Sequence, residues 1–334
     1  MKVGKVPENV LKRSVMGQLH YHRDEVLLGP GIGEDCAALQ LAEDEMMVLS
    51  VDPITGTSRD VGRLAVEITA NDLASAGAEP IGVMLTVLLP EGTREAALKR
   101  MMEQVEQVCA SLHMQILGGH TEVTSVVNQP VISVAGVGKV KKGGLISTAG
   151  AKPGMDVILT KWIGLEGTSI IAKEKESELT EHFPEPFVAQ AKELDQYLSV
   201  VPEARVAVRV GVAAMHDVTE GGIFGALWEM AEASGVGLEI DLKKIPLRQE
   251  TIELCEYFDL NPYELISSGS MLMAAAEGAT LVRDLEESGI PAVIIGKTTD
   301  GNDRVVIREG ERRFLEPPKR DELYKIYQER KEKR

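Results

Sequence analysis

The chain has 334 residues, of which 44 % are hydrophobic and 26 % are charged, and its formal net charge is −16. The length predicts about two domains and a sizeable core. The negative charge opposes binding to nucleic acid or to an anionic membrane surface, and no apolar run reaches the ~18 residues that a membrane span requires. The N-terminus carries no apolar stretch of the secretory type, so we expect a cytoplasmic protein.

The first half predicts strands that alternate with helices. An opening helix is expected at 8–22, and Thr93 is expected to cap a later helix that begins just after it. Gly118–Val123 is expected to be a turn after a short strand. The remaining predicted elements are strands at 46–52, 81–89, 114–117 and 131–140, a helix that closes near Gly77, and a domain boundary at about 141–154.

A glycine-rich turn at Gly29–Ala38 runs into two adjacent carboxylates, Glu34 and Asp35. Glycines at alternate positions, among them Gly31 and Gly33, let the backbone approach a ligand closely. The two carboxylates can bind a divalent cation through oxygen. This pattern favours metal-bound phosphate, and the alternative is an ordinary loop.

Asn71 and Asp72 interrupt an otherwise alanine-rich helix. Both residue types compete with the helical backbone for hydrogen bonds, so their presence inside this helix needs an explanation. The reason is either a function or a solvated helix face, and the pattern leaves both open.

The second half predicts an alternation of strands and helices. One strand ends at His216 and Asp217 and turns through Thr219, Gly221 and Gly222 into a helix, whose free amides form an anion site. Gly296-Lys-Thr-Thr resembles part of a Walker loop but lacks its first glycine, so we interpret it as a turn. The predicted strands are 156–159, 213–218, 237–241, 271–275 and 292–295, and the main helices are near 168, 186–199, 202–211, 223–233, 247–258 and 279–288.

Four aspartates lie at the edges of apolar elements, beside glycine or other small residues: Asp35, Asp52, Asp72 and Asp217. Gathered in one place, they would repel one another strongly unless cations balanced their charge. Mg²⁺ together with a triphosphate would supply that balance. The alternative is that they are scattered surface acids in a chain with 52 acidic residues.

Five motifs, in this order, resemble the aminoimidazole ribonucleotide synthetase-like superfamily. They are Gly-Ile-Gly-Glu-Asp-Cys-Ala-Ala-Leu at 31–39, Ser50-Val-Asp52, the segment 70–80, Gly118-Gly-His-Thr-Glu122 and His216-Asp-Val-Thr-Glu-Gly-Gly222. The resemblance implies an α+β fold with an N-terminal domain at 1–143, whose sheet pairs in a homodimer, a C-terminal domain at 154–312 and a charged helical tail at 313–334.

The resemblance also implies a site for ATP and Mg²⁺. Its metal ligands would be Asp35, Asp52, Asp72 and Asp217. Its nucleotide-binding residues would be Gly31, Gly33, Asn71, Gly119, Thr219, Gly221 and Gly222. The common chemistry of the superfamily is activation of an oxygen atom of a small acceptor by transfer of the γ-phosphoryl group. The catalytic group is not identified, and the candidates are His120, Glu122 and His216.

Among the branches, the second half is most similar to the hydrogenase maturation factor HypE. The family has a tail cysteine, which 313–334 lacks, and it has Gly-Asp-Thr-Lys and Asn-Glu-Gly-Lys where this chain has Gly119-His-Thr-Glu122 and Ser267-Ser-Gly-Ser270. We therefore expect a HypE-like enzyme without the thiocarbamate-carrying tail. The alternatives are a small-molecule kinase similar to thiamine monophosphate kinase and a non-catalytic nucleotide-binding partner in a maturation complex.

Overall fold

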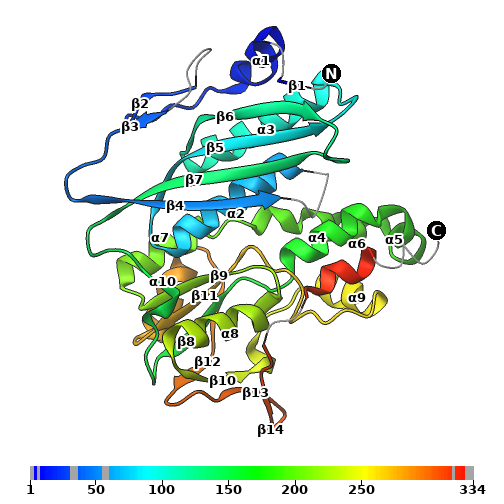
Figure 1. Cartoon of the computed structure of the whole chain (residues 1–334). Helices are drawn as coiled ribbons and strands as arrows, with labels where there is room; N and C mark the ends of the chain where they lie inside the picture. Colours follow the sequence, from blue (N-terminus) through cyan, green and yellow to red (C-terminus); the bar gives the residue numbers. More distant parts are fainter. Residues whose placement is uncertain (1–3, 6–7, 31–36, 55–59, 318–319, 328–334) are drawn as a thin grey trace. The chain divides into compact units, whose positions relative to one another are not determined.

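The computed structural model describes residues 4–5, 8–30, 37–54, 60–317 and 320–327, and the chain divides into two compact units (Figure 1). The first unit comprises residues 1–74 and 78–145, and the second comprises residues 75–77 and 146–334. Each unit contains both helices and a sheet, so the fold belongs to the predicted α+β class.

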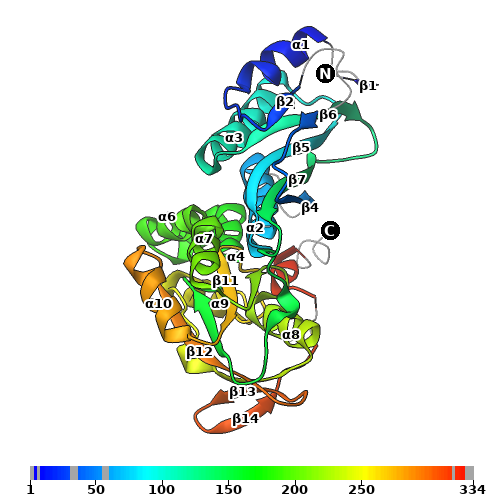
Figure 2. The ribbon, with the colours of Figure 1, turned by 90° about the vertical axis from the view of Figure 1, so that its left-hand side faces the viewer.

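The first unit is built on a five-stranded sheet with one face covered by two helices (Figures 1 and 2). Helices α2 (Val61–Ser75) and α3 (Glu95–Leu112) form this cover, and α1 (Glu8–Ser14) contacts α3. Gly136 lets α2 approach closely, because a Cβ atom there would lie 2.4 Å from the Thr69 methyl carbon. The strands, in spatial order, are β1 (Gly4–Lys5), β6 (Gln115–Thr124), β5 (Glu79–Pro90), β7 (Val131–Lys141) and β4 (Glu45–Ile54).

The opposite face of this sheet, here called the open face, has a covered end and an exposed apolar end. The small sheet of β2 (Val26–Leu28) and β3 (Ala38–Leu39) covers one end, where Val26 and Leu39 pack on a core that includes Val137. Elsewhere on the open face four apolar side chains are exposed: Met47, Leu49, Val51 and Met84. Leu49 is 67 % exposed and Val51 is 65 % exposed, so this part of the sheet is apolar yet faces water.

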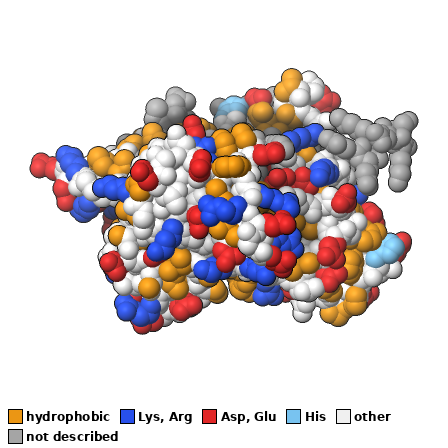
Figure 3. Space-filling model, turned by 90° about the horizontal axis from the view of Figure 1, so that it is seen from below, with side chains coloured by type: hydrophobic (Ala, Val, Ile, Leu, Met, Phe, Trp, Pro, Cys, Tyr) orange, Lys and Arg blue, Asp and Glu red, His pale blue; other side chains and the backbone are white. Residues whose placement is uncertain are grey.

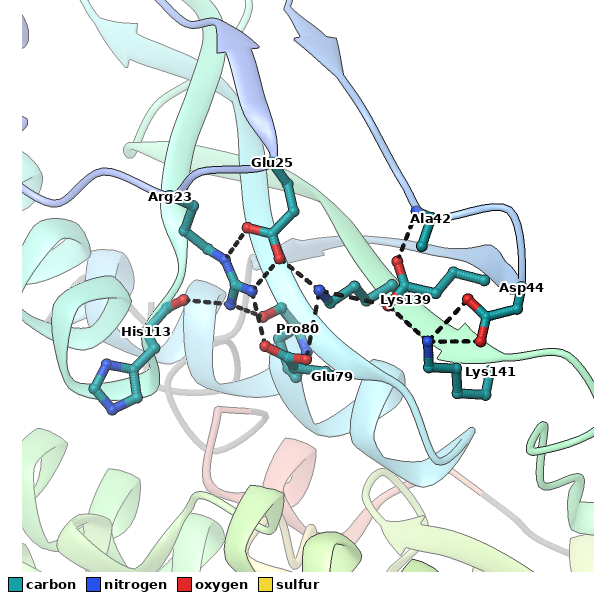
Figure 4. A network of polar contacts seen from close by, with 10 residues as sticks. Arg23, Glu25, Ala42, Asp44, Glu79, Pro80, His113, Lys139 and Lys141 are labelled. Atoms are coloured by element: carbon teal, nitrogen blue, oxygen red, sulfur yellow. Dashed lines mark hydrogen bonds and ion pairs between the residues drawn. The ribbon is translucent and has the colours of Figure 1, made fainter.

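An ion-pair network fixes the segment before β2 to the sheet (Figure 4). The Arg23 guanidinium donates to both Glu25 oxygens, at 2.6 and 2.8 Å, and to Glu79 at 2.8 Å. The Lys139 ammonium, on β7, lies 2.5 Å from Glu25. These side chains are mostly buried except Glu79. The Arg23 hydrogen bonds therefore hold the pKa of the Glu25 carboxyl well below its usual range, and the Lys139 hydrogen bond acts in the same direction.

The second unit is built on a seven-stranded sheet with helices on both faces (Figure 2). Helix α8 (Gly222–Ser234) packs on one face through Ile223 and Leu227, and α7 (Val201–Val210) and α10 (Gly278–Glu287) lie on the other. The strands, in spatial order, are β14 (Glu311–Phe314), β13 (Arg304–Arg308), β10 (Gly237–Asp241), β12 (Ala292–Thr299), β8 (Asp156–Thr160), β11 (Ser270–Ala275) and β9 (Ala214–Val218).

A second hydrophobic core in this unit lies among short helices. Its helices are α4 (Leu165–Glu174), α5 (Glu176–His182), α6 (Glu185–Lys192) and α9 (Gln249–Tyr257). Residues 320–327, here called the docking segment, contribute Leu323 and Ile326 to it, and both side chains are buried. Burial of each such side chain stabilises by about 1.5–3 kcal/mol, so Leu323 and Ile326 hold the docking segment against this core.

Three predictions about local structure outside the candidate site are wrong. The opening helix ends at Ser14, well before residue 22. Helix α3 has Arg94 at its N-cap position without a side-chain cap, because the Thr93 hydroxyl donates instead to the Pro90 carbonyl at 2.6 Å. Gly296–Thr299 is part of strand β12, where it pairs with β10, so this segment is not a turn.

Three further features concern the cysteines, the helices and the surface. Cys109 and Cys255 are free and buried, and burial raises the pKa of Cys255 to about 12. Among the described residues, none of the helices has both the length and the apolar character needed to cross a bilayer. On the face drawn in Figure 3, acidic and basic side chains lie interspersed with apolar ones.

We predict that Glu25→Gln destabilises the first unit by about 1.5–3 kcal/mol at neutral pH, the range for hydrogen bonds to charged groups. The folded-state pKa of Glu25 is lowered from its ordinary value of 4.5. Its contribution is therefore present above that value and is lost as the pH falls through the lowered pKa. Urea midpoints measured between about pH 7 and pH 3.5 should show the variant and the wild type converging in acid.

Asp44→Asn is the matched control, since Asp44 is 66 % exposed in its pair with Lys141 and should contribute little. A Glu25→Gln penalty that stayed constant across the pH range would show that the network does not act through the Glu25 charge.

Candidate functional site

The structure brings Asp52 and Asp72 together in the first unit. Asp52 lies on β4 and Asp72 on α2, and the Ser50 hydroxyl lies between them. The hydroxyl oxygen is 2.5 Å from Asp72 Oδ2 and 3.5 Å from Asp52 Oδ2. A hydroxyl donates one proton, which the distances assign to Asp72. The sequence analysis named Ser50 only as part of a motif and gave it no role in the site, although it precedes Asp52 by two residues and therefore shares its side of the strand.

Two other predicted residues of this unit lie in closely packed surroundings. Asn71 is buried on α2, next to Asp72. Gly119 lies in β6, where a Cβ atom would come 2.1 Å from the Leu85 carbonyl oxygen. Any side chain at position 119 would therefore displace strand β5, whether or not a ligand binds there.

His120 and Glu122 form a pair on the open face. The His120 Nε2 atom is 3.1 Å from Glu122 Oε2, and the two residues lie in strand β6. The predicted turn at Gly118–Val123 is therefore wrong, because this segment pairs in parallel with β5. Through β5 and β7, His120 is in register with Pro53 and Gly119 with Asp52. Because neighbouring positions point to opposite faces, His120 and Asp52 lie on opposite faces of the sheet.

The turn from β9 into α8 holds the predicted residues of the second unit. Gly221 and Gly222 have φ values of 82° and 61°, which favour glycine. A Cβ atom at Gly222 would also lie 2.6 Å from the Tyr263 carbonyl oxygen. Before the turn, Asp217 is 5 % exposed and accepts a hydrogen bond from the Ser75 hydroxyl at 3.2 Å. Ser75 belongs to this unit by its contacts.

The amides of this turn already meet acceptors from the chain itself. The Gly222 amide donates to the Thr219 carbonyl at 3.0 Å, and the Phe224 amide donates to the Tyr263 carbonyl at 3.1 Å. The Gly221 amide donates to the Asp321 carboxylate at 2.7 Å. Asp321 was not foreseen, because a residue a hundred positions away has no local signal that pairs it with this turn.

His216 is separated from Asp217 by the alternation of strand β9. The His216 Nε2 atom lies 2.7 Å from Glu229 Oε2 on α8, so its ring faces that helix. Asp217 points to the other side of the strand. The two adjacent residues therefore cannot bind one ligand from the same face.

Three predicted residues, Gly31, Gly33 and Asp35, lie outside the described residues. In the part of the chain that the structure describes, there is no group of three or more His, Cys, Asp or Glu side chains with metal-binding geometry. The Asp52 and Asp72 carboxylates do fit Mg²⁺ chemically, because Mg²⁺ prefers carboxylate oxygens and uses one or two carboxylates together with phosphates. They would form part of a ligand set.

Family models match both halves of the chain. Residues 33–140 match the N-terminal domain of the AIR synthase related proteins, and residues 152–309 match the C-terminal domain. The chain belongs to the AIR synthase-related family. The recognition based on the five motifs is confirmed.

Relatives within this family include proteins of hydrogenase maturation. The chain is 28 % identical over 312 residues to a putative hydrogenase expression/formation protein of Methanocaldococcus jannaschii, with 91 % of each chain covered. It is 31 % identical over 259 residues to carbamoyl dehydratase HypE of Cupriavidus necator, covering 75 % of this chain and 72 % of the relative. The crystal structure of E. coli HypE matches with a TM-score of 0.81 at 21 % identity, covering 96 % of this chain and all of that one.

Other solved structures of similar fold carry ligands or partners. HypE in complex with ATP matches with a TM-score of 0.79 at 19 % identity, covering 96 % of this chain and 97 % of that one. A HypE–HypF complex matches with a TM-score of 0.71, and AaThiL complexed with AMPPCP and TMP matches with a TM-score of 0.66. At 21–22 % identity, these last two likenesses show a shared fold.

We predict that Gly222→Ala destabilises the second unit more than Gly235→Ala, at the other end of α8. Both glycines have positive φ, which costs an alanine about 1–2 kcal/mol. A Cβ atom at Gly235 meets nothing within 4 Å, whereas at Gly222 it meets two backbone carbonyls. Overpacking adds about 1–3 kcal/mol at Gly222. Thermal unfolding of the two variants measures the difference, and equal melting temperatures would contradict the tight packing of this turn.

Proposed function

We propose that this protein is a Mg-ATP-dependent enzyme that activates an oxygen atom of a small acceptor by phosphoryl transfer, in the manner of HypE. The observation that carries the proposal is the acid pair Asp52 and Asp72 on either side of Ser50. It is supported by membership of a family in which HypE has been solved in complex with ATP. Asp35 and Asp217 complete the proposed metal-ligand set.

Bound Mg-ATP would supply the phosphoryl group and the positive charge that lets the acids lie close together. The contribution of the chain itself is to position the two carboxylates. Strand β4 and helix α2 fix the backbone beneath the acid pair, and the Ser50 hydroxyl orients the Asp72 carboxylate. The proposed nucleotide contacts are Gly31, Gly33, Asn71, Gly119, Thr219, Gly221 and Gly222.

Two imidazole–carboxylate pairs are the candidates for proton transfer to the acceptor. His120 and Glu122 are both partly exposed on the open face of the single chain. His216 is more enclosed by its contact with Glu229. The acceptor itself is a small molecule, and a further maturation protein is the proposed partner, as in the HypE–HypF complex.

A small-molecule kinase is the second candidate, and the loop before β11 favours it. Where HypE has glutamate and lysine, this chain has Ser268 and Ser270, and both are fully buried. The Ser270 hydroxyl donates to the Trp162 carbonyl at 2.6 Å and so serves the fold. Because this chain lacks both charged groups, simple transfer of a phosphoryl group is favoured over dehydration of an amide. A non-catalytic nucleotide-binding partner is the third candidate.

The site assignment predicts that Asp72→Asn weakens binding of Mg-ATP by about tenfold or more, because it removes one charged metal ligand. The fold should persist, since asparagine matches aspartate in volume. Calorimetric titration with Mg-ATP measures the effect, and Asp44→Asn, which removes an exposed charge in the same unit, is the control. An unchanged affinity for Mg-ATP in Asp72→Asn would refute the site.

The products of turnover separate the candidates. With an acceptor found by thermal-shift screening in the presence of Mg-ATP, phosphorus NMR should show free phosphate for a HypE-like activation. A new phosphoester signal would instead establish the kinase. Binding of Mg-ATP without turnover of any acceptor would support the non-catalytic partner.

We further propose that the protein is a homodimer whose subunits meet through the open face of the first unit. The support is the exposed apolar set Met47, Leu49, Val51 and Met84. The first three lie on β4 and Met84 lies on β5, and Ala135 of the intervening strand β7 is in register with both Val51 and Met84. An exposed contiguous apolar surface of this kind marks an interaction site.

Accordingly, Leu49→Asp should convert the dimer to a monomer, because it would place an unpaired charge within the apolar contact. Light scattering coupled to size exclusion measures the mass. Leu27→Asp is the matched control, since Leu27 is 66 % exposed and lies on β2, outside this apolar set. A mass unaffected by Leu49→Asp would exclude this face as the interface.

A further inference from the structure

The docking segment places a carboxylate against the turn that begins α8. Asp321 is only 3 % exposed, and its Oδ2 atom accepts from the Gly221 amide at 2.7 Å. Its Oδ1 atom accepts from the Leu323 amide at 2.8 Å, which fixes the orientation of the carboxylate. An anion of the chain itself therefore lies at the start of a helix of 13 residues, where the helix dipole favours negative charge.

Among the described residues, Asp321 is the one side chain whose oxygen accepts a hydrogen bond from the amides of this turn. The Gly222 and Phe224 amides donate to the backbone carbonyls of Thr219 and Tyr263, which cannot leave without rebuilding the loops. Asp321 can leave by a movement of the docking segment. Because one amide donates one hydrogen bond at full strength, Gly221 serves either Asp321 or a ligand oxygen.

Side-chain and backbone contacts hold the docking segment in place. The Glu322 carboxylate accepts from the Asn261 amide at 2.9 Å, and the Glu322 amide donates to the Glu264 carbonyl at 3.3 Å. Leu323 and Ile326 are buried in the core of short helices. Asn261 and Glu264 belong to the same loop as Tyr263, so the segment and the turn share a support.

We propose that the docking segment is an internal competitor of nucleotide phosphate: the Asp321 carboxylate occupies the Gly221 amide until a phosphate oxygen of Mg-ATP displaces it. The inference rests on the proposed function, in which Gly221 contacts the nucleotide. Binding of Mg-ATP and docking of residues 320–327 then exclude each other, and each weakens the other by the same factor. Binding of the nucleotide would then expose the surface that residues 320–327 cover.

The first test uses the wild-type protein. Hydrogen exchange of the Gly221 and Leu323 amides is followed by mass spectrometry with and without saturating Mg-ATP. Mg-ATP should accelerate exchange across 320–327, because the Leu323 amide loses its Asp321 acceptor, while Gly221 stays protected by the new one. Unchanged or slower exchange across 320–327 with Mg-ATP bound would overturn the inference.

The second test uses Asp321→Asn, which keeps an acceptor of the same shape but removes its charge. It should tighten binding of Mg-ATP, measured by calorimetry, by about fivefold or more, the lower end of typical couplings between sites. The matched control is Asp241→Asn, which changes a carboxylate that caps a short helix elsewhere in this unit by accepting from the Lys243 amide. Inorganic phosphate serves as a second probe and should show the same order of affinities.

The outcomes distinguish this inference from the function on which it rests. If Mg-ATP binds to the wild type, and Asp321→Asn leaves its affinity unchanged, the competition is refuted and the proposed function stands. If Mg-ATP binds neither to the wild type nor to the variants, both the proposed function and the inference that rests on it are refuted.

Discussion

The close approach of α2 to the sheet of the first unit determines where its acids lie. Gly136 on β7 permits it, since even one methylene there would come within 2.4 Å of Thr69. The approach brings the Asp72 carboxylate within hydrogen-bond distance of Ser50 on β4. A contact between a glycine and the Thr69 methyl group, without any charge in it, thus allows the acid pair to form. A bulkier residue at position 136 would separate Asp72 from Asp52 without touching either.

Two mostly buried carboxylates of this acidic chain, Glu25 and Asp321, differ in the donors that they meet. Glu25 meets a guanidinium and an ammonium, so its charge stabilises the fold and its pKa is lowered. Asp321 meets backbone amides, but burial outweighs them and raises the pKa of its carboxyl. Burial therefore disfavours the charged form of Asp321, whereas the cations beside Glu25 favour its charged form.

Much of the framework can be predicted from the sequence because it is locally encoded. Strands β4, β5 and β7, the alanine-rich helix α2 and the two-glycine turn before α8 each carry their own periodicity or punctuation, and Asp52 and Asp72 could be placed on them. The Gly118–Gly119 pair was misread, because glycine in a strand is favoured here by the crowding of the Leu85 carbonyl, which only the paired strand reveals. Asp321 and Ser75 could not be found, since their contacts join segments far apart in the chain.

The acid pair and His120 lie on opposite faces of the sheet, and this separation limits which groups can act together in phosphoryl transfer. Phosphoryl transfer depends on positioning and charge neutralisation and needs little covalent help from the protein. In the proposed function Asp52 and Asp72 contribute to binding the metal for that step, so an imidazole on the opposite face is not required beside them. His120 and Glu122 share their face with the exposed apolar residues Met84 and Val51. Any acceptor that they contact therefore approaches from the side where we place the second subunit, and not from the side of α2.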